Sequence, residues 1–232
     1  MSNAPKRKGP AIPPSPPRKK KRAGPEPGGR RPLYVVLGVA AGAVIVAVTA
    51  IVASSGGSSS PKEVNLLEIQ PVEVSGAALP AFQAGQADAA VGQAAPRVNG
   101  KTFGSRSISI KSGKPTMLVF LSHWSPASQK QAPALVQWHH GGLAPEALQV
   151  ISVITGSDPA KPNYPASSWL VDVEWPWSVV VDDTAQSVRA AYGFSDVPGI
   201  VLLDKDGVVR FRAQGELAVA DLQPQLHSAL GL

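Results

Sequence analysis

The apolar residues of this chain form one long uninterrupted run and a series of shorter ones. Residues 33–53, LYVVLGVAAGAVIVAVTAIVA, carry no charge over 21 positions. As a helix rising about 1.5 Å per residue, such a segment spans roughly 30 Å, the hydrocarbon thickness of a bilayer. The later runs are shorter and are separated by polar and turn residues. The pattern therefore predicts one transmembrane helix at 33–53 and a globular domain at 65–232.

A cleaved signal peptide is the other interpretation of residues 33–53. Signal peptides have apolar regions of about 7–15 residues, shorter than this run, so an uncleaved single-pass anchor is favoured. Gly38 and Gly42 form a GxxxG pattern, which lets two helices approach closely. Spans rich in Gly and Ala produce this pattern by chance, so a homodimer through the two glycines stays one option for the membrane segment.

The two flanks of the span differ in charge. Residues 1–32 contain ten of the 22 Lys and Arg residues, one of the 16 acidic residues and nine prolines, which predicts a disordered basic tail. The run at 18–22 resembles a nucleic-acid patch, but basic residues beside a span are retained in the cytoplasm. Residues 54–64 are rich in Ser and Gly and predict a flexible linker. The rest of the chain is mildly acidic, which argues against a nucleic-acid partner.

The globular part contains two apolar runs typical of strands buried on both faces, at residues 116–121 (TMLVFL) and 148–154. Between them, the spacing of Ala132, Leu135 and Trp138 predicts a helix over 126–138. Further strands are predicted at 71–74, 105–110, 178–181, 200–203 and 208–211, and further helices at 167–171, 185–192 and 218–230. Apart from the strand at 71–74, residues 62–100 allow no secure assignment.

The order of these elements predicts the fold class. Strands that alternate with helices favour a parallel core. The turn Asp204-Lys-Asp-Gly207 predicts a closing hairpin, because glycine accepts positive φ. Pro224 fits the last helix only near its first turn. We therefore expect an α/β fold with a mixed central sheet flanked by helices.

The chain contains no cysteine. This excludes disulfides, iron–sulfur clusters, thiolate zinc sites and c-type haem attachment. The domain must then be held together by its apolar core, which a segment of this length can supply. We predict no cofactor.

Two motifs in the second half of the chain resemble a known family. Residues 120–133, FLSHWSPASQKQAP, and residues 192–207, YGFSDVPGIVLLDKDG, are similar to two segments of the thioredoxin-like superfamily, in particular its TlpA/ResA-type membrane-anchored thiol-disulfide oxidoreductases. Residues 91–96 and 113–115 match the approach to the first core strand, so the resemblance covers roughly 90–230. It implies a thioredoxin-like fold after one transmembrane helix, with Pro198 in the place of the family's cis-proline.

The departure from the family concerns its chemistry. Ser125 and Ser128 stand where the family has its two cysteines. There the first thiol lies at a helix N-terminus, which favours the thiolate, and disulfide exchange needs both sulfurs. Serine hydroxyls can form no such bond, so we predict both positions to be redox-inactive. Ser125 is expected to cap the helix instead, with Pro126 at its first position. Natural loss and deliberate replacement both fit, and the intact Met1, tail and span favour natural loss.

Other candidate sites have simpler interpretations. Ser125 with His123 could suggest a hydrolase, but no GxSxG elbow is present and no acid is placed to orient the histidine. His139 and His140 are adjacent and make a poor chelate, so no metal site is predicted. The only other histidine is His227. For Trp169, Trp175 and Trp177, which lie near prolines, packing is favoured over a binding surface. Asp182 and Asp183 should end a strand and cap the helix that follows.

Two hypotheses for function follow. In the family, the cis-proline loop offers backbone groups to an extended peptide, which needs no thiol. A groove of Trp124, Val197 and Pro198 beside Ser125 could therefore bind an exported protein or peptide, making the domain an extracytoplasmic binding or scaffolding module on the cell membrane, with the N-terminus cytoplasmic. The alternative is a thiol-disulfide oxidoreductase of this family in an inactivated or cysteine-substituted form.

Overall fold

The computed structural model describes residues 66–232. The basic tail, the predicted span with Gly38 and Gly42, and the whole of the linker lie outside these residues, so these predictions stay predictions. Within 66–232, none of the helices has the length and apolar character needed to cross a membrane.

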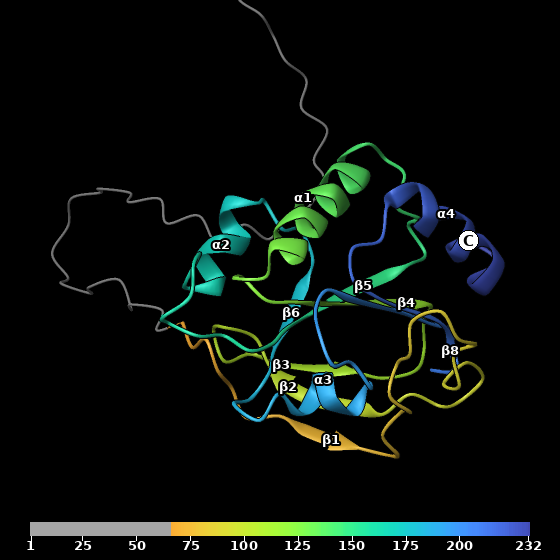
Figure 1. Ribbon diagram of the computed structural model, residues 1–232, viewed down its shortest axis with the longest axis horizontal. Coiled ribbons are helices and arrows are strands. Elements are labelled where there is room, and N and C mark those ends of the chain that lie inside the picture. Colours follow the sequence, from red (N-terminus) through yellow and green to blue (C-terminus); the bar gives the residue numbers. More distant parts are fainter. Residues whose placement is uncertain (1–65) are drawn as a thin grey trace, which may run out of the picture. The chain divides into compact units, whose positions relative to one another are not determined.

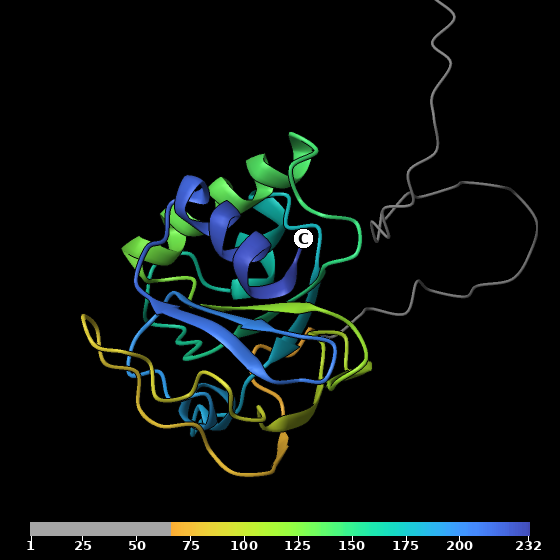
Figure 2. The same cartoon turned by 90° about the vertical axis from the view of Figure 1, so that its right-hand side faces the viewer.

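A mixed sheet forms the centre of the domain, and its strands follow the order β1-β2-β6-β5-β4-β7-β8, with β3 paired to β2. The strands are β1 (Glu73–Ser75), β2 (Arg97–Lys101), β3 (Ser107–Ile110), β4 (Thr116–Leu121), β5 (Gln149–Ile154), β6 (Ser178–Val181), β7 (Gly199–Leu203) and β8 (Val209–Gln214); the helices are α1 (Pro126–His140), α2 (Ala166–Asp172), α3 (Ser187–Ala191) and α4 (Val219–Leu230). Figures 1 and 2 show α1, α2 and α4 over one face of the central strands, and α3 on the other face together with β1–β3.

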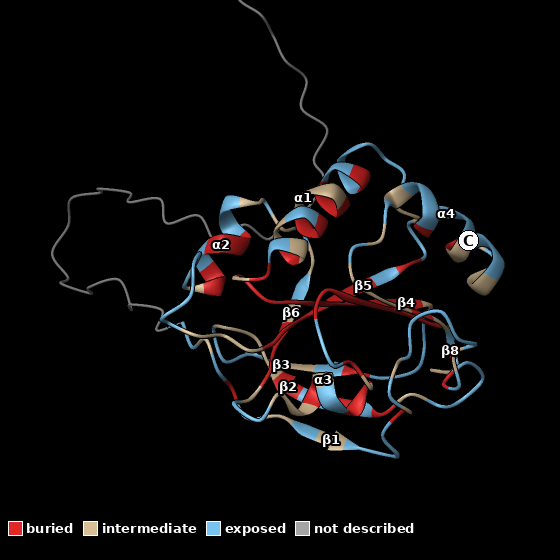
Figure 3. Cartoon of the chain, viewed as in Figure 1, coloured by how far each residue is buried: buried red, intermediate tan, exposed pale blue. Residues whose placement is uncertain are grey.

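The core is built on both faces of β4. This strand pairs in parallel with β5, which pairs in parallel with β6, whereas β7 runs antiparallel to β4. All six residues of β4 are buried, and the central strands form the buried middle of the domain in Figure 3. Met117 and Leu121 belong to one apolar cluster and Leu118 and Phe120 to the other. The continuous apolar run in the sequence thus reflects a strand covered on both faces.

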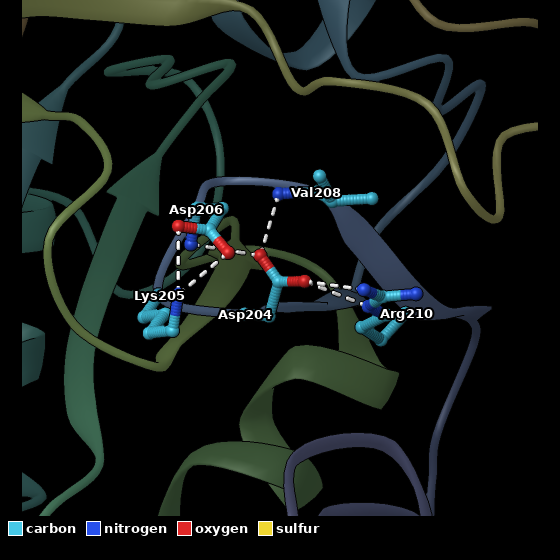
Figure 4. A network of polar contacts seen from close by, with 5 residues as sticks. All are labelled: Asp204, Lys205, Asp206, Val208 and Arg210. Atoms are coloured by element: carbon cyan, nitrogen blue, oxygen red, sulfur yellow. Dashed lines mark hydrogen bonds and ion pairs between the residues drawn. The ribbon is translucent and has the colours of Figure 1, made fainter.

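The β7–β8 hairpin has the predicted turn, and Asp204 organises it (Figure 4). Its carboxylate accepts hydrogen bonds from the N–H groups of Asp206 at 2.9 Å and Val208 at 3.0 Å, and from Arg210 Nε at 2.8 Å. Gly207 has a φ of +79°, which explains the glycine at this position. Although burial raises the pKa of Asp204, these hydrogen bonds and the Arg210 guanidinium bring it below its usual value.

The N-terminal part of the domain contains the segment that could not be assigned from the sequence. Residues 66–96 are largely irregular, and β2 follows them as a strand between β1 and β3. The strand predicted at 71–74 lies at Glu73–Ser75. Pro224 is the sixth residue of α4, beyond the first turn to which it was expected to be confined. Its ring nitrogen has no hydrogen to donate to the carbonyl group one turn earlier.

One buried ion pair fixes the irregular segment to the sheet. The Arg212 side chain on β8 is fully buried and pairs with Asp88. Its guanidinium also donates to the carbonyl oxygens of Pro80 at 3.0 Å and Tyr192 at 2.7 Å, and it lies over the rings of Phe82 and Phe194. A buried arginine needs such complete satisfaction, because an unpaired charge in the interior is costly.

Candidate functional site

Ser125 begins helix α1 in the manner that its sequence predicts. It has an extended backbone, with φ −73° and ψ 121°, and its Oγ accepts a hydrogen bond from the Ser128 N–H at 3.4 Å. Pro126 follows as the first helical residue, where a missing N–H has no cost to the helix. The serine at the family's first cysteine position therefore acts as an N-cap.

Ser128, at the second cysteine position, is also used structurally. The residue is fully buried, and its Oγ accepts a hydrogen bond from the Ser122 N–H at 3.3 Å. Ser122 is the first residue after β4, and its own hydroxyl donates a hydrogen bond to the Thr155 carbonyl oxygen at 2.5 Å. The two serine hydroxyls thus hold the β4–α1 junction together.

The Ser125 hydroxyl joins this junction to the loop before β7. Its Oγ donates to the Val197 carbonyl oxygen at 3.2 Å, across 72 positions of sequence. The Val197 N–H donates to the Asp196 carboxylate at 2.7 Å. The Val197–Pro198 peptide bond is cis, as the resemblance implies. Both backbone groups of Val197 are therefore bonded to side chains, whereas β7, which starts at the second residue after it, pairs with strands on both sides.

Trp124 closes one side of the same region. Its indole Nε1 donates to the Gly156 carbonyl oxygen at 2.8 Å, and the side chain is half-buried. This bond holds the loop after β5 against the start of α1. The structure thus brings Ser125 and Val197 into direct contact, with Trp124 and Pro198 next to them in the chain. Ser125, Val197 and Pro198 are buried, so little of their own surface is exposed.

His123 is a structural residue of the β4–α1 loop. It is fully buried, its Nδ1 lies 2.6 Å from the Pro162 carbonyl oxygen, and its Nε2 accepts from the Asp158 N–H at 3.2 Å. Since a carbonyl oxygen only accepts, the ring proton is on Nδ1. Both ring nitrogens are engaged elsewhere, so His123 and Ser125 do not form the base–nucleophile pair that a hydrolase needs.

Asp182 and Asp183 cap α3, as the sequence predicts. The buried Asp182 carboxylate accepts from the N–H groups of Val188 at 3.0 Å and Arg189 at 3.2 Å, and Asp183 accepts from the Ser187 N–H at 2.9 Å. Burial raises the pKa of Asp182, and these hydrogen bonds offset part of the effect. The two carboxylates therefore serve the fold and not the candidate site.

His139, His140 and the tryptophans at 169, 175 and 177 make contacts that do not involve Ser125. His139 and His140 are exposed in the last turn of α1, and the His139 ring is 5.2 Å from that of Trp177. Trp169 is buried, and the Trp175 Nε1 donates to the Ser152 Oγ at 2.7 Å, which agrees with the packing interpretation. Within 66–232, no group of three or more His, Asp or Glu side chains could hold a metal ion.

The sequence did not single out Asp196. Its carboxylate satisfies the Val197 N–H, and the exposed side chain stands beside the candidate surface. Asp commonly bonds nearby backbone groups in turns, so an Asp immediately before Val-Pro is the signal that could have identified it.

Comparisons with known proteins bear on the fold of the domain. No protein-family model and no curated protein matches the chain. Among solved structures, a protein assigned as the thiol:disulfide interchange protein DsbE from Chlorobium tepidum is 23% identical, with a TM-score of 0.51, and the match covers 61% of this chain and 98% of that one. A protein assigned as a disulfide isomerase from Bacteroides thetaiotaomicron is 18% identical, with a TM-score of 0.50 and coverages of 61% and 91%. The domain therefore has a thioredoxin-like α/β fold without cysteine.

Proposed function

We propose that this chain is a single-pass membrane protein whose extracytoplasmic thioredoxin-like domain binds an extended segment of an exported polypeptide without covalent chemistry. The observation that carries the proposal is the hydrogen bonding of the Val197 backbone. Its N–H and C=O groups are bonded to the side chains of Asp196 and Ser125 and not to another strand. Side-chain partners can be exchanged for the backbone of an incoming peptide at little net cost in hydrogen bonds.

The absence of cysteine supports binding over thiol chemistry. The whole chain lacks cysteine, and both hydroxyls at the family's cysteine positions are engaged in the β4–α1 junction. A client could be neither attacked by a thiolate nor released by a second thiol. What the site retains is the contact between the α1 N-terminus and the loop before β7, which is a docking element and needs no redox step.

Photo-crosslinking in cells tests the proposal. A photoreactive amino acid at Asp196, exposed beside Val197, should capture a discrete extracytoplasmic polypeptide, whereas the same group at the exposed Leu143, in the loop between α1 and β5, should not. A client captured equally from both positions, or none from position 196 in a well-expressed chain, contradicts the proposal.

A second candidate function is that of a thiol-disulfide oxidoreductase in an inactivated or cysteine-substituted form. It is favoured by the assignments of the two structural neighbours described above, a thiol:disulfide interchange protein and a protein disulfide isomerase, and by the position of Ser125 at a helix N-terminus. The double variant Ser125→Cys/Ser128→Cys should then reduce an insulin-type disulfide substrate, with Ser125→Cys/Ser128→Ala as the control. A folded double variant without activity argues against this candidate.

A further inference from the structure

The exposed apolar side chains of the domain are unevenly distributed. Among the residues that the structure describes, seven large apolar side chains are exposed, and five of them lie in two short segments, 66–69 and 164–171. We call these five the docking patch: Leu66, Leu67, Ile69, Tyr164 and Val171, which are 41–75% exposed. Single exposed apolar residues are ordinary, but a concentration of them in one region marks an interaction surface.

The two segments of the docking patch are joined by hydrogen bonds. The Glu68 carboxylate accepts from the Ser167 N–H in the first turn of α2, with both oxygens at 3.3 Å. On the other side, the Leu67 N–H donates to the Phe103 carbonyl oxygen at 2.9 Å. Figure 1 shows the first described residues beside α2. The start of the domain is therefore held in a defined position with Leu66 and Ile69 facing out.

The place at which the chain enters the domain indicates what covers this patch. Only twelve residues, 54–65, separate the predicted span from Leu66. A chain of that length reaches at most about 43 Å when fully extended, and a Gly/Ser-rich one has an average span of about 20 Å. Since this predicted tether ends at Leu66, within the docking patch, the patch stays within that distance of the end of the predicted span.

The chemistry of the patch suits a bilayer surface. Leu, Ile and Val gain by partial burial among the acyl chains, and tyrosine is favoured at the level of the headgroups. Two acids border the patch: Glu68 is only half-exposed and already bonded to α2, and the exposed Asp172 follows Val171 at the end of that helix. Tyr164 also packs against His123, with ring centroids 5.7 Å apart, so the patch adjoins the loop that carries Trp124 and Ser125.

We propose that the docking patch seats the domain on the outer surface of the membrane that anchors it. This inference rests on the proposed membrane anchor, and it adds to it a fixed orientation. It also places the start of α1 beside the lipid, so that clients would be met at the membrane surface.

The absence of cysteine makes the test direct, because a single introduced cysteine labels uniquely. The full chain is reconstituted in phosphatidylcholine vesicles with and without lipid carrying a doxyl quencher on the acyl chain. A fluorescent label on Ile69→Cys or Tyr164→Cys should be quenched at least twofold more than one on Leu143→Cys or Val91→Cys. The latter positions have similar exposure, 56% and 49%, but belong to other segments, the loop between α1 and β5 and the residues before β2.

A second variant and a flotation assay keep the outcomes separate. Replacing Leu66, Leu67 and Ile69 by Ser should reduce the quenching at position 164 to that of the controls. Equal quenching at all positions, in vesicles that float with the protein after an alkaline wash, overturns the docking inference and leaves the anchor intact. Protein that does not float overturns the anchor itself. Self-quenching at position 69 that grows with protein density, without lipid quenching, assigns the patch to a second copy of the chain and also overturns the inference.

Discussion

Two polar networks of this domain contrast in strength. Around Arg212, a fully buried guanidinium meets a carboxylate and two carbonyl oxygens. Around Val197, two backbone groups are each bonded to one short side chain, from Ser125 and Asp196. Bonds to charged groups in the interior are strong and costly to break, whereas a bond between neutral groups, such as that from Ser125, or a bond to an exposed carboxylate, such as that of Asp196, contributes less net free energy. The first network fixes the chain, and the second leaves groups that a partner can take over.

Breaking the Arg212 network should have the largest effect. Arg212→Ala leaves the Asp88 carboxylate without its partner and opens a cavity beside Phe82 and Phe194. We expect the free energy of unfolding to fall by about 3–5 kcal/mol. Urea denaturation followed by tryptophan fluorescence measures this loss. A loss below about 1 kcal/mol would show that the buried pair contributes no more than a surface pair.

The same pair predicts a dependence of stability on pH. The hydrogen bond from Arg212 holds the pKa of Asp88 below its usual value, although burial opposes it. The folded state then binds the Asp88 proton more weakly than the unfolded chain does. The stabilisation is complete above the unfolded pKa of about 3.9, and it is lost as the pH falls through the lower folded pKa.

Comparing the free energy of unfolding of the wild type with that of Asp88→Asn between pH 6 and 2.5 isolates the contribution of the Asp88 carboxylate. The wild type should lose more stability over that range than the variant does. Burial raises the pKa of Asp182, so this residue has the opposite effect, a stabilisation that is lost as the pH rises. Asp182 is present in both proteins, and its effect therefore cancels in the comparison. Parallel pH profiles of the urea midpoint would contradict the assignment to Asp88.

Removing the Ser125 hydroxyl should have a smaller effect on stability and an opposite effect on binding. Ser125→Ala leaves the Ser128 N–H uncapped, which costs about 1 kcal/mol. It also frees the Val197 carbonyl oxygen, which normally accepts from Ser125. A client that competes for this group should then bind about fivefold more tightly, the equivalent of one net hydrogen bond. Crosslinking yield from position 196, titrated against the identified client, measures the gain. Weaker binding would show that Ser125 contacts the client itself.

The smallest effect is expected at the hairpin turn. Arg210 pairs with Asp204 at 2.7 Å, but its side chain is 45% exposed. Arg210→Ala should therefore cost at most about 1 kcal/mol, since solvent screens such pairs. In the same urea experiment it serves as the matched control for Arg212→Ala, on the same strand. Equal losses for the two arginines would remove the contrast between buried and exposed networks.

The sequence predicted best what local patterns determine. The continuous apolar run gave β4 with its observed bounds, and the Ser-Pro pair gave the start and cap of α1. The strand Arg97–Lys101 was missed, because RVNGK has only one large apolar residue and is a strand through its pairing with β1 and β3.

The contacts across the candidate site were less accessible to prediction. The resemblance placed Pro198 near Ser125, whereas the hydrogen bond from the Val197 N–H to Asp196 had only a weak local signal, the tendency of Asp to bond nearby backbone groups in turns. Arg212 and Asp88 are separated by 124 positions, and no periodicity pairs two charges over that distance. Such partners are chosen by packing, which a single sequence does not display.

The cysteine-free interior has a consequence for biogenesis. Because no covalent crosslink contributes to this core, the folded domain is indifferent to the glutathione poise of its compartment, unlike small exported domains that need oxidation to mature. Under the proposed single-pass topology, a molecule inserted in the wrong orientation would therefore fold as well as a correct one. In that topology the orientation would have to be set by the basic residues that flank the predicted span and not by failure of the domain to fold.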